Sequence, residues 1–202
     1  QWDKSIGGSQ NENFRSAIPL ADGGFLLAGS SDSVVSGEKT QGTQGGEDFW
    51  VVKIDANGNV VWDKTLGGTA SDRARSLAVT ADGNYLIAGF SESGQGGDKT
   101  EASRGQKDFW AIKMDPNGNK LWDKTLGGSN DDVVTSVRST PDGGSLLVGY
   151  SESGQGGDKT QASRGQKDFW AVKLDSNGNK LWDKVYGGSS VDEPSKILPL
   201  RN

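Results

Sequence analysis

The chain has 202 residues, of which only 32% are hydrophobic, so any core has to be assembled from short apolar runs. Its formal net charge is −5, with charges of both signs spread along the chain, which argues against nucleic acid or an anionic membrane surface as a partner. Cysteine and histidine are absent, which excludes disulfides, thiol chemistry and imidazole or thiolate metal sites, and we expect no cofactor.

Glycine and tryptophan indicate the fold class. Thirty-one glycines against five prolines predict many tight turns, and seven tryptophans supply large buried area from few positions, as short strands require. No segment approaches the roughly 18 apolar residues that cross a bilayer, so we expect no membrane insertion. Gln1 opens directly onto a repeat motif rather than onto a leader, which favours a processed or excised product. We therefore expect a soluble, all-β chain.

A sixty-residue period runs through the whole sequence. Trp-Asp-Lys recurs at Trp2, Trp62, Trp122 and Trp182, and Asp-Phe-Trp recurs at Asp48, Asp108 and Asp168. We divide the single repeat domain of residues 1–202 into the last strand of a preceding unit (1–13), three units (14–73, 74–133 and 134–192) and the first strand of a following unit (193–202).

Each unit contains four predicted strands, which in the middle unit cover residues 76–80, 84–90, 109–115 and 119–124. The first pair is joined by turns such as Thr-Ala-Asp-Gly, and the second pair by Asp-x-Asn-Gly-Asn. Glycine supplies the positive φ that such hairpins require, a role that we assign to Gly58, Gly118 and Gly178. Alternation in residues 49–55 places apolar side chains on both faces, so that strand is expected to be covered on both sides.

A four-stranded unit that hides both faces against copies of itself is typical of a propeller blade. The sequence therefore predicts an all-β array of tandem four-stranded antiparallel blades, a β-propeller or a fragment of one. About fourteen strands, or three and a half blades, are expected here, with terminal strands at 1–5 and 193–200, whereas propellers close with roughly four to eight blades. A β-trefoil, which also has three four-stranded units, is the alternative.

The tryptophans of both motifs are expected to be structural. They are Trp50, Trp62, Trp110, Trp122, Trp170 and Trp182. A flat indole face also suits stacking on a sugar, but a residue that recurs in every unit is explained more economically by packing between blades.

The long loops are the better candidates for ligand binding, because recognition is normally placed on connections carried by a rigid scaffold. Residues 98–108 carry three acidic and three basic residues, residues 158–168 carry two and three, and residues 38–48 carry three and one, so a ligand shared equally by all three loops is not expected. The candidate ligand-binding residues are Lys99, Arg104, Lys107, Lys159, Arg164 and Lys167. The alternative is that these charges pair to hold the loops in place.

Four motifs carry a resemblance to a known repeat. They are Asp-Gly-Gly-Ser-Leu-Leu-Val-Gly-Tyr at 142–150, Gly-Asp-Lys-Thr-x-Ala-Ser-Arg-Gly at 157–165, Asp-Phe-Trp-Ala-Val-Lys-Leu-Asp at 168–175 and Asn-Gly-Asn-Lys-Leu-Trp-Asp-Lys at 177–184. The chain resembles the propeller-like tandem repeats of large secreted and surface proteins of Bacteroidota, many of them exported by the type IX route, and more loosely the delta-60 repeat. The resemblance implies an extracellular or cell-surface scaffold, often in an adhesive or carbohydrate-related setting, and it transfers no catalytic residue.

Catalysis and metal binding are the least favoured classes. A paired-carboxylate glycosidase would need a single asymmetric constellation, and the acids specific to one unit are Asp131, Asp132 and Glu193. The Asp-x-Asn-Gly-Asn segments resemble calcium loops, but glycine is fourth where an EF-type loop has it sixth, so we interpret them as hairpin turns. We predict no catalytic residue and no metal site.

Together these observations predict a non-enzymatic extracellular repeat scaffold, an adhesion element or ligand-binding module. Its partner would be an extracellular glycan or protein. A carbohydrate-binding or carbohydrate-active propeller is one alternative. Self-assembly into a filament or ring through open strand edges is another.

Overall fold

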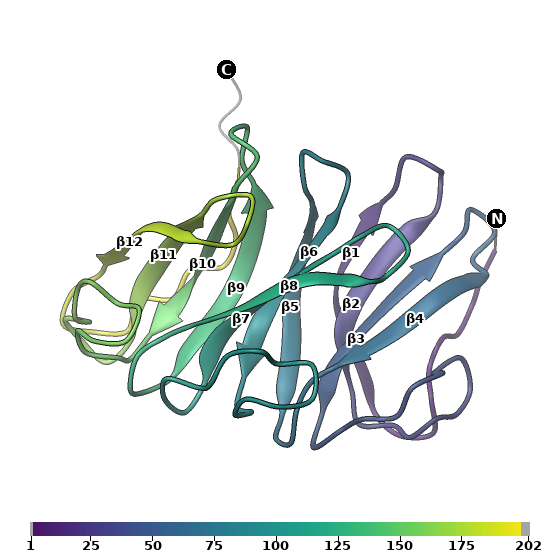
Figure 1. Ribbon diagram of the computed structural model, residues 1–202, viewed down its shortest axis with the longest axis horizontal. Coiled ribbons are helices and arrows are strands. Elements are labelled where there is room, and N and C mark those ends of the chain that lie inside the picture. Colours follow the sequence, from purple (N-terminus) through teal and green to yellow (C-terminus); the bar gives the residue numbers. More distant parts are fainter. Residues whose placement is uncertain (1, 199–202) are drawn as a thin grey trace.

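The computed structural model describes residues 2–198 and contains three four-stranded antiparallel sheets, each formed by one repeat unit. In every sheet the strands lie in chain order, so that each pairs with the strand before and after it. Figure 1 shows the three sheets side by side along the longest axis. The predicted all-β array of tandem four-stranded units is confirmed.

The strand bounds repeat closely from sheet to sheet. The first sheet contains β1 (Glu12–Pro19), β2 (Phe25–Ser31), β3 (Asp48–Ile54) and β4 (Val60–Leu66). The second contains β5 (Asp72–Val79), β6 (Tyr85–Ser91), β7 (Asp108–Met114) and β8 (Lys120–Leu126). The third contains β9 (Asp132–Ser139), β10 (Ser145–Ser151), β11 (Asp168–Leu174) and β12 (Lys180–Tyr186).

Each sheet begins two residues before the unit boundaries drawn from the sequence, because its first strand starts earlier than the apolar pattern indicates. The predicted strand 76–80 is in fact β5, which starts at Asp72. Its first half contains Arg73 and Arg75, which break the apolar alternation, and pairing with β6 is shifted between Ala74 and Ser76. A bulge of this kind adds one residue to a strand and therefore hides the strand's period of two.

The β-trefoil alternative is wrong. Among the described residues, every named strand pairs only with strands of its own sheet. Within each unit the four strands pair in chain order, as a meander. A propeller blade has this order and packs face to face against the next blade.

The terminal segments were expected to be strands at 1–5 and 193–200. Within the described residues they carry no assigned strand, so twelve strands are present in 2–198 instead of about fourteen; Gln1 and residues 199–202 lie outside the described residues. Their contacts nevertheless repeat those of strands in neighbouring units. Trp2 donates from Nε1 to the carbonyl of Ala56 (2.9 Å), as Trp62 does to that of Pro116 (3.2 Å).

The hydrophobic core consists of layers between successive sheets. One apolar cluster joins the first and second sheets, and another joins the second and third. At the centre of these layers Phe49 lies against Trp110, with ring centroids 4.8 Å apart, and Phe109 lies against Trp170 at 4.6 Å. All four rings are fully buried, which explains why β3 and β7 are apolar on both faces.

The first strand of each sheet is the one nearest to the preceding sheet. The backbone of β5 approaches β1, β2 and β3, and that of β9 approaches β5, β6 and β7. Because the strands alternate in direction, the short hairpins lie at one end of every sheet, and the long loops 32–47, 92–107 and 152–167 lie at the other (Figure 1).

Candidate functional site

The aspartate of each Trp-Asp-Lys motif connects two strands and the long loop of its own sheet. In the second sheet Asp123 Oδ2 accepts hydrogen bonds from Trp110 Nε1 (3.1 Å) and from the backbone nitrogen of Thr100 (3.0 Å). The same pair of bonds is made by Asp63 in the first sheet and by Asp183 in the third. The loops are therefore anchored to the frame by a repeated polar contact.

The first lysine of each long loop points into the protein. Lys99 and Lys159 have exposed fractions of 2% and 3%, and burial lowers the pKa of both. Lys99 Nζ donates to Thr125 Oγ1 at 2.7 Å, and Lys159 Nζ lies 5.2 Å from the centroid of the Trp170 ring. These two candidate ligand-binding residues lie inside the frame and not on the loop surface.

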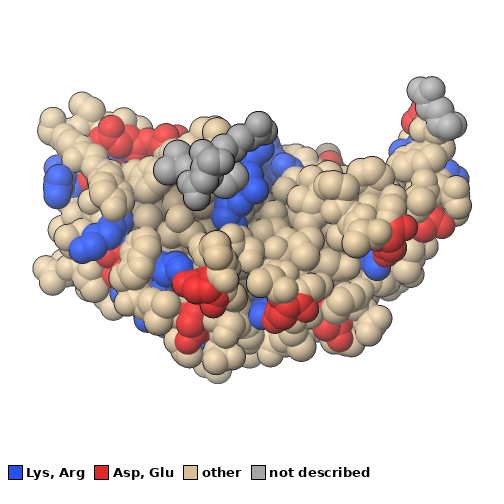
Figure 2. Space-filling view, turned by 90° about the horizontal axis from the view of Figure 1, so that it is seen from above, with Lys and Arg blue, Asp and Glu red and all other residues tan. Residues whose placement is uncertain are grey.

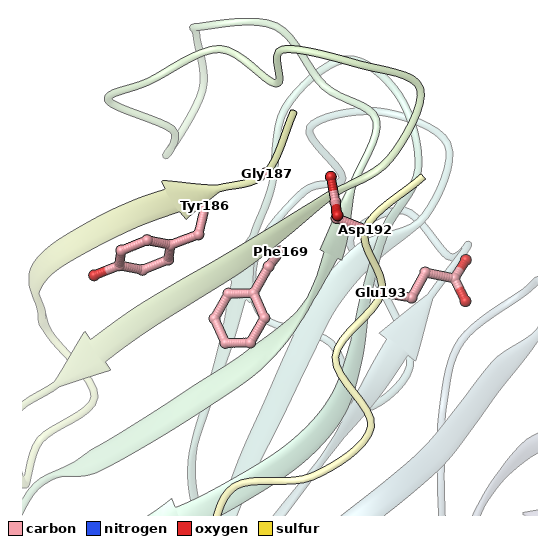
Figure 3. A pocket seen from close by; sticks show the side chains of 5 residues that line it. All are labelled: Phe169, Tyr186, Gly187, Asp192 and Glu193. Atoms are coloured by element: carbon pink, nitrogen blue, oxygen red, sulfur yellow. The ribbon is translucent and has the colours of Figure 1, made fainter. Parts of the chain in front are cut away.

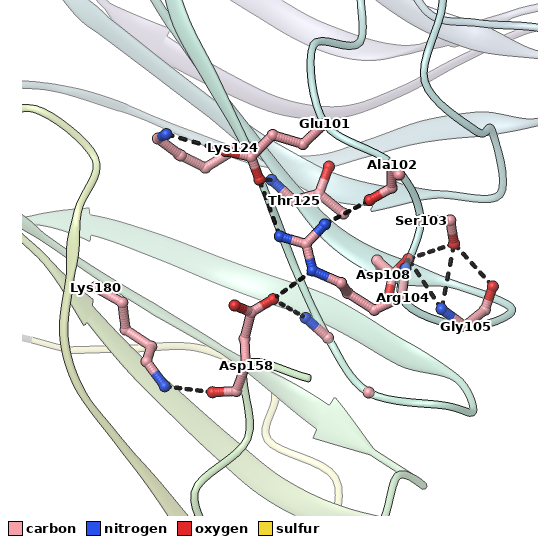
Figure 4. Close-up of polar contacts among 12 residues, drawn as sticks. Glu101, Ala102, Ser103, Arg104, Gly105, Asp108, Lys124, Thr125, Asp158 and Lys180 are labelled. Carbon is pink, nitrogen blue, oxygen red and sulfur yellow. Dashed lines mark hydrogen bonds and ion pairs between the residues drawn. The ribbon is translucent and has the colours of Figure 1, made fainter. Parts of the chain in front are cut away.

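Arg104 links its loop to the loop of the next sheet (Figure 4). Its Nε lies 3.1 Å from Asp158 Oδ2, its Nη2 lies 3.3 Å from Glu101 Oε2, and its Nη1 donates to the carbonyl of Ala102 at 2.6 Å. Gln44 makes the equivalent link to Asp98 one unit earlier. The guanidinium is thus engaged within the protein, as the loop-pairing alternative expects.

The other three candidate ligand-binding residues lie on the surface, and each makes a polar contact within the protein. Lys107 pairs with Asp131 at 2.7 Å, and Lys167 pairs with Glu193 at 2.9 Å. The Arg164 guanidinium donates from Nη1 to the carbonyl of Gly187 at 3.4 Å. In Figure 2 basic and acidic side chains lie next to each other along the rim of one face, with a group of basic ones in the hollow at its middle.

The three acids considered for catalysis have structural partners, and Asp132 is not specific to its unit, because Asp72 and Asp192 stand at the same repeat position. Asp131 and Glu193 each pair with a lysine, as described above. Asp132 is fully buried, and its Oδ2 accepts hydrogen bonds from the Gly128 nitrogen (2.7 Å) and from Ser153 Oγ (2.9 Å). Burial raises the pKa of Asp132 to about 6. Glu193 is the one of the three that also lines a cavity, on the outer face of the third sheet.

The Asp-x-Asn-Gly-Asn segments form hairpin turns whose aspartate oxygens are used within the turn. Asp115 accepts hydrogen bonds from the backbone nitrogens of Asn117 and Asn119 and from the Asn119 amide. Gly118 has φ of +82°, and a Cβ there would lie 2.9 Å from Lys64 Cε and 3.3 Å from the Trp62 ring. Gly58 and Gly178 repeat this φ, with Trp2 and Trp122 as their neighbours.

The six tryptophans expected to be structural differ in how deeply they are buried. Trp50, Trp110 and Trp170 are fully buried in the layers between sheets. Trp62 and Trp122 are partly buried against those layers, and their Nε1 atoms donate to a carbonyl of the next unit. Trp182, at the last sheet, has an exposed fraction of 43%.

The outer face of the third sheet carries an apolar cavity of about 410 Å³ that the sequence analysis missed. It is lined by Phe169, Tyr186, Gly187, Asp192 and Glu193 (Figure 3). Tyr186 has an exposed fraction of 57%, whereas Leu126, one unit earlier, has 5%. The replacement of a core leucine by tyrosine at the repeat position is the signal that marks this face in the sequence.

Residues 2–198 contain no cluster of three or more acidic side chains placed to hold a metal ion. They also contain no helix with the length and apolar character of a membrane span.

Two known proteins resemble this chain. The regulatory protein FlaEY of Caulobacter vibrioides is 27% identical over 152 residues, which cover 70% of this chain and 16% of that protein. An uncharacterized WD repeat-containing protein of Acanthamoeba polyphaga mimivirus is 28% identical over 133 residues, or 59% of this chain and 10% of that protein. No family model matches. This chain therefore corresponds to only a small part of either relative.

WD repeats are sequence signatures of four-stranded propeller blades. The sheets of this chain have the same strand number and the same meander order. They are blades of the propeller type. A WD repeat has roughly 40–45 residues, and the longer period of these blades is accommodated by the long loop between the second and third strands of each.

Proposed function

We propose that this chain is a non-enzymatic repeat module of an extracellular or cell-surface protein, which acts as a scaffold or adhesion element and binds a glycan or protein. The observation that carries the proposal is that the recurring polar side chains make contacts within the protein. The Trp–Asp bonds, the buried lysines and the loop arginine are consumed by the frame itself. What differs between units is the charge of the long loops, all at one end of a rigid array.

The extracellular location is supported by the resemblance of the sixty-residue motifs to repeats of secreted and surface Bacteroidota proteins, including those exported by the type IX route. Propeller-type blades as such occur in many settings, so the sheets alone do not favour one location. The repeat motifs are therefore the basis for this part of the proposal.

The test is a screen of the folded chain against glycan arrays and arrays of surface proteins. We expect a ligand whose binding weakens when loop residues such as Lys107 and Arg164 are replaced. The variant Trp182→Ala, which removes an indole with an exposed fraction of 43%, tests the carbohydrate alternative. A screen that is negative at millimolar ligand would remove the binding part of the proposal and leave a spacer.

Self-association is a second candidate function, and the outer face of the third sheet favours it. Phe169 and Tyr186 occupy the positions at which Phe109 and Leu126 meet the next sheet. A sheet of a second copy would cover them. Light scattering across a concentration series tests this: growth in mass with concentration supports it, and Phe169→Ala should then reduce that growth. A constant monomer mass would contradict it.

A further inference from the structure

The first strand of every sheet carries one bulged residue at the same repeat position. Pairing passes from Phe14 directly to Ser16 in β1 and from Ala74 to Ser76 in β5, so that Arg15 and Arg75 have no partner in the ladder. In β9 the residue passed over is Thr135. Bulges are enriched next to binding sites because they turn a side chain out of the sheet's alternation.

The bulged side chains of all three sheets line a single cavity of about 630 Å³. Tyr150 and the ion pair of Lys167 with Glu193 lie on its wall together with the three bulged side chains. Pockets for small molecules occupy roughly 300–1,000 Å³, so the cavity has room for such a ligand. It lies along the first strands, and Lys167 is the residue of the long loops that reaches it.

Among the described residues the two arginines form no ion pair, although Glu193 lies on the same cavity wall. By contrast, nearby Arg73 lies 2.7 Å from Glu47 and Lys167 lies 2.9 Å from Glu193. Nε of Arg75 is buried and has no hydrogen-bond partner. Its guanidinium lies 5.4 Å from the Phe90 ring, and burial together with Arg15 and Arg73 lowers its pKa.

The third sheet shows what the bulge does without an arginine. Thr135, at the same bulge, donates its hydroxyl hydrogen to the carbonyl of Val148 at 3.3 Å and so satisfies itself within its own sheet. The bulge therefore does not need a guanidinium for its geometry. Two arginines that repel each other at equivalent positions cost stability unless an anion is present between them.

We propose that Arg15 and Arg75 bind a small anion with at least two negative charges, a di- or tricarboxylate or a free sulfate or phosphate. A guanidinium presents a planar fork of N–H donors that matches two oxygens of such a group. The two guanidiniums lie on the first strands of adjacent sheets, so a ligand with more than one negative charge would neutralise both. The inference goes beyond the proposed function, whose ligand is a glycan or protein, and it can fail while the proposed function stands.

The experiment is isothermal titration of the chain with citrate, sodium sulfate and sodium phosphate at constant ionic strength, with sodium chloride as the reference. We expect binding of citrate if the site selects planar carboxylates, and of sulfate or phosphate if it selects tetrahedral oxyanions. Arg15→Gln and Arg75→Gln should each weaken that binding by about tenfold or more, the effect of losing a charge-assisted hydrogen bond. Lys184→Gln, the same charge change on the exposed side of β12, should leave it unchanged.

A gain of affinity provides the complementary test in case an arginine variant does not fold. Thr135→Arg places a third guanidinium at the third bulge and should tighten binding by about tenfold. Heats equal to those of chloride for all three anions would overturn the proposal. So would binding that Arg75→Gln and Lys184→Gln weaken equally.

Discussion

Nε1 of Trp110 donates a hydrogen bond of 3.1 Å to Oδ2 of Asp123, and both side chains are buried within the second sheet. The other oxygen of Asp123 lies 2.8 Å from Lys120 Nζ. One carboxylate thus connects the third strand, the fourth strand and, through Thr100, the long loop. This arrangement explains why Trp-Asp-Lys and Asp-Phe-Trp recur together at a constant spacing.

Removing this carboxylate should destabilise the sheet. We expect Asp123→Ala to lower the free energy of unfolding by about 2–4 kcal/mol, because it leaves buried donors on Trp110 and Thr100 without an acceptor. Asp123→Asn retains one acceptor oxygen and should cost less. Urea denaturation followed by circular dichroism measures both. Equal midpoints for Asp123→Ala and the unmodified chain would contradict the role given to this residue.

Replacing the phenylalanine of an Asp-Phe-Trp motif should cost more stability where a following sheet covers its ring. Phe109 is fully buried against Trp170, so Phe109→Ala should cost about 3–5 kcal/mol. Phe169 is the matched control, because it lies on the outer face of the third sheet, and Phe169→Ala should cost about 1 kcal/mol. Similar losses for the two variants would show that the inter-sheet layer is not where the stability lies.

Glycine in the second hairpin of each unit should be hard to replace. Gly118 has φ of +82°, and a Cβ would meet Lys64 and the Trp62 ring, so Gly118→Ala should cost about 1–2 kcal/mol or more. A Cβ added at Gly94 would lie in open space, and Gly94 has no positive φ, so Gly94→Ala should stay within about 0.5 kcal/mol of the unmodified chain. Thermal melts of both variants test the difference, which would vanish if the turn were loosely packed.

The buried carboxyl of Asp132 should make stability depend on pH. Its pKa is raised to about 6 by burial, so between roughly pH 4 and pH 6 the folded chain holds a proton that the unfolded chain has released. Its contribution to stability is therefore largest below pH 4 and falls as pH rises through this window. Asp132→Asn removes the titrating group, so the loss of stability from pH 4 to pH 7 should be smaller by about 1–3 kcal/mol.

Urea midpoints of the two proteins across that pH range provide the measurement for Asp132. Asp131→Asn is the control, because Asp131 pairs with the partly exposed Lys107. Parallel pH profiles for Asp132→Asn and the unmodified chain would mean that Asp132 is ionised in the folded state at all these values.

Repetition made the fold predictable from the sequence. A constant period, Asn-Gly turns and strands with two apolar faces together specify sheets that pack on their own copies, and all three features recur in the structure. The start of each first strand was not predictable, because Arg15 and Arg75 interrupt the apolar pattern at the bulges. A bulge depends on pairing with the next strand, which single-strand periodicity does not report.

The candidate site was only partly predictable for a related reason. Lys99 and Arg104 stand five residues apart in one polar loop, yet the first is buried beside Thr125 and the second reaches across to the next sheet. The direction in which each charged side chain of the loop points is decided by partners distant in the sequence, Thr125 for Lys99 and Asp158 for Arg104. Loop sequence alone therefore identified the region but not the orientation of its side chains.

The most direct test of the account is a double-mutant cycle between Phe109 and Trp170, with Phe109→Ala, Trp170→Ala and the double variant compared by urea denaturation. If the sheets stack as blades through this contact, the coupling energy should be about 0.5–1.5 kcal/mol. A coupling energy indistinguishable from zero would contradict the face-to-face packing of successive sheets, and with it the propeller-type arrangement.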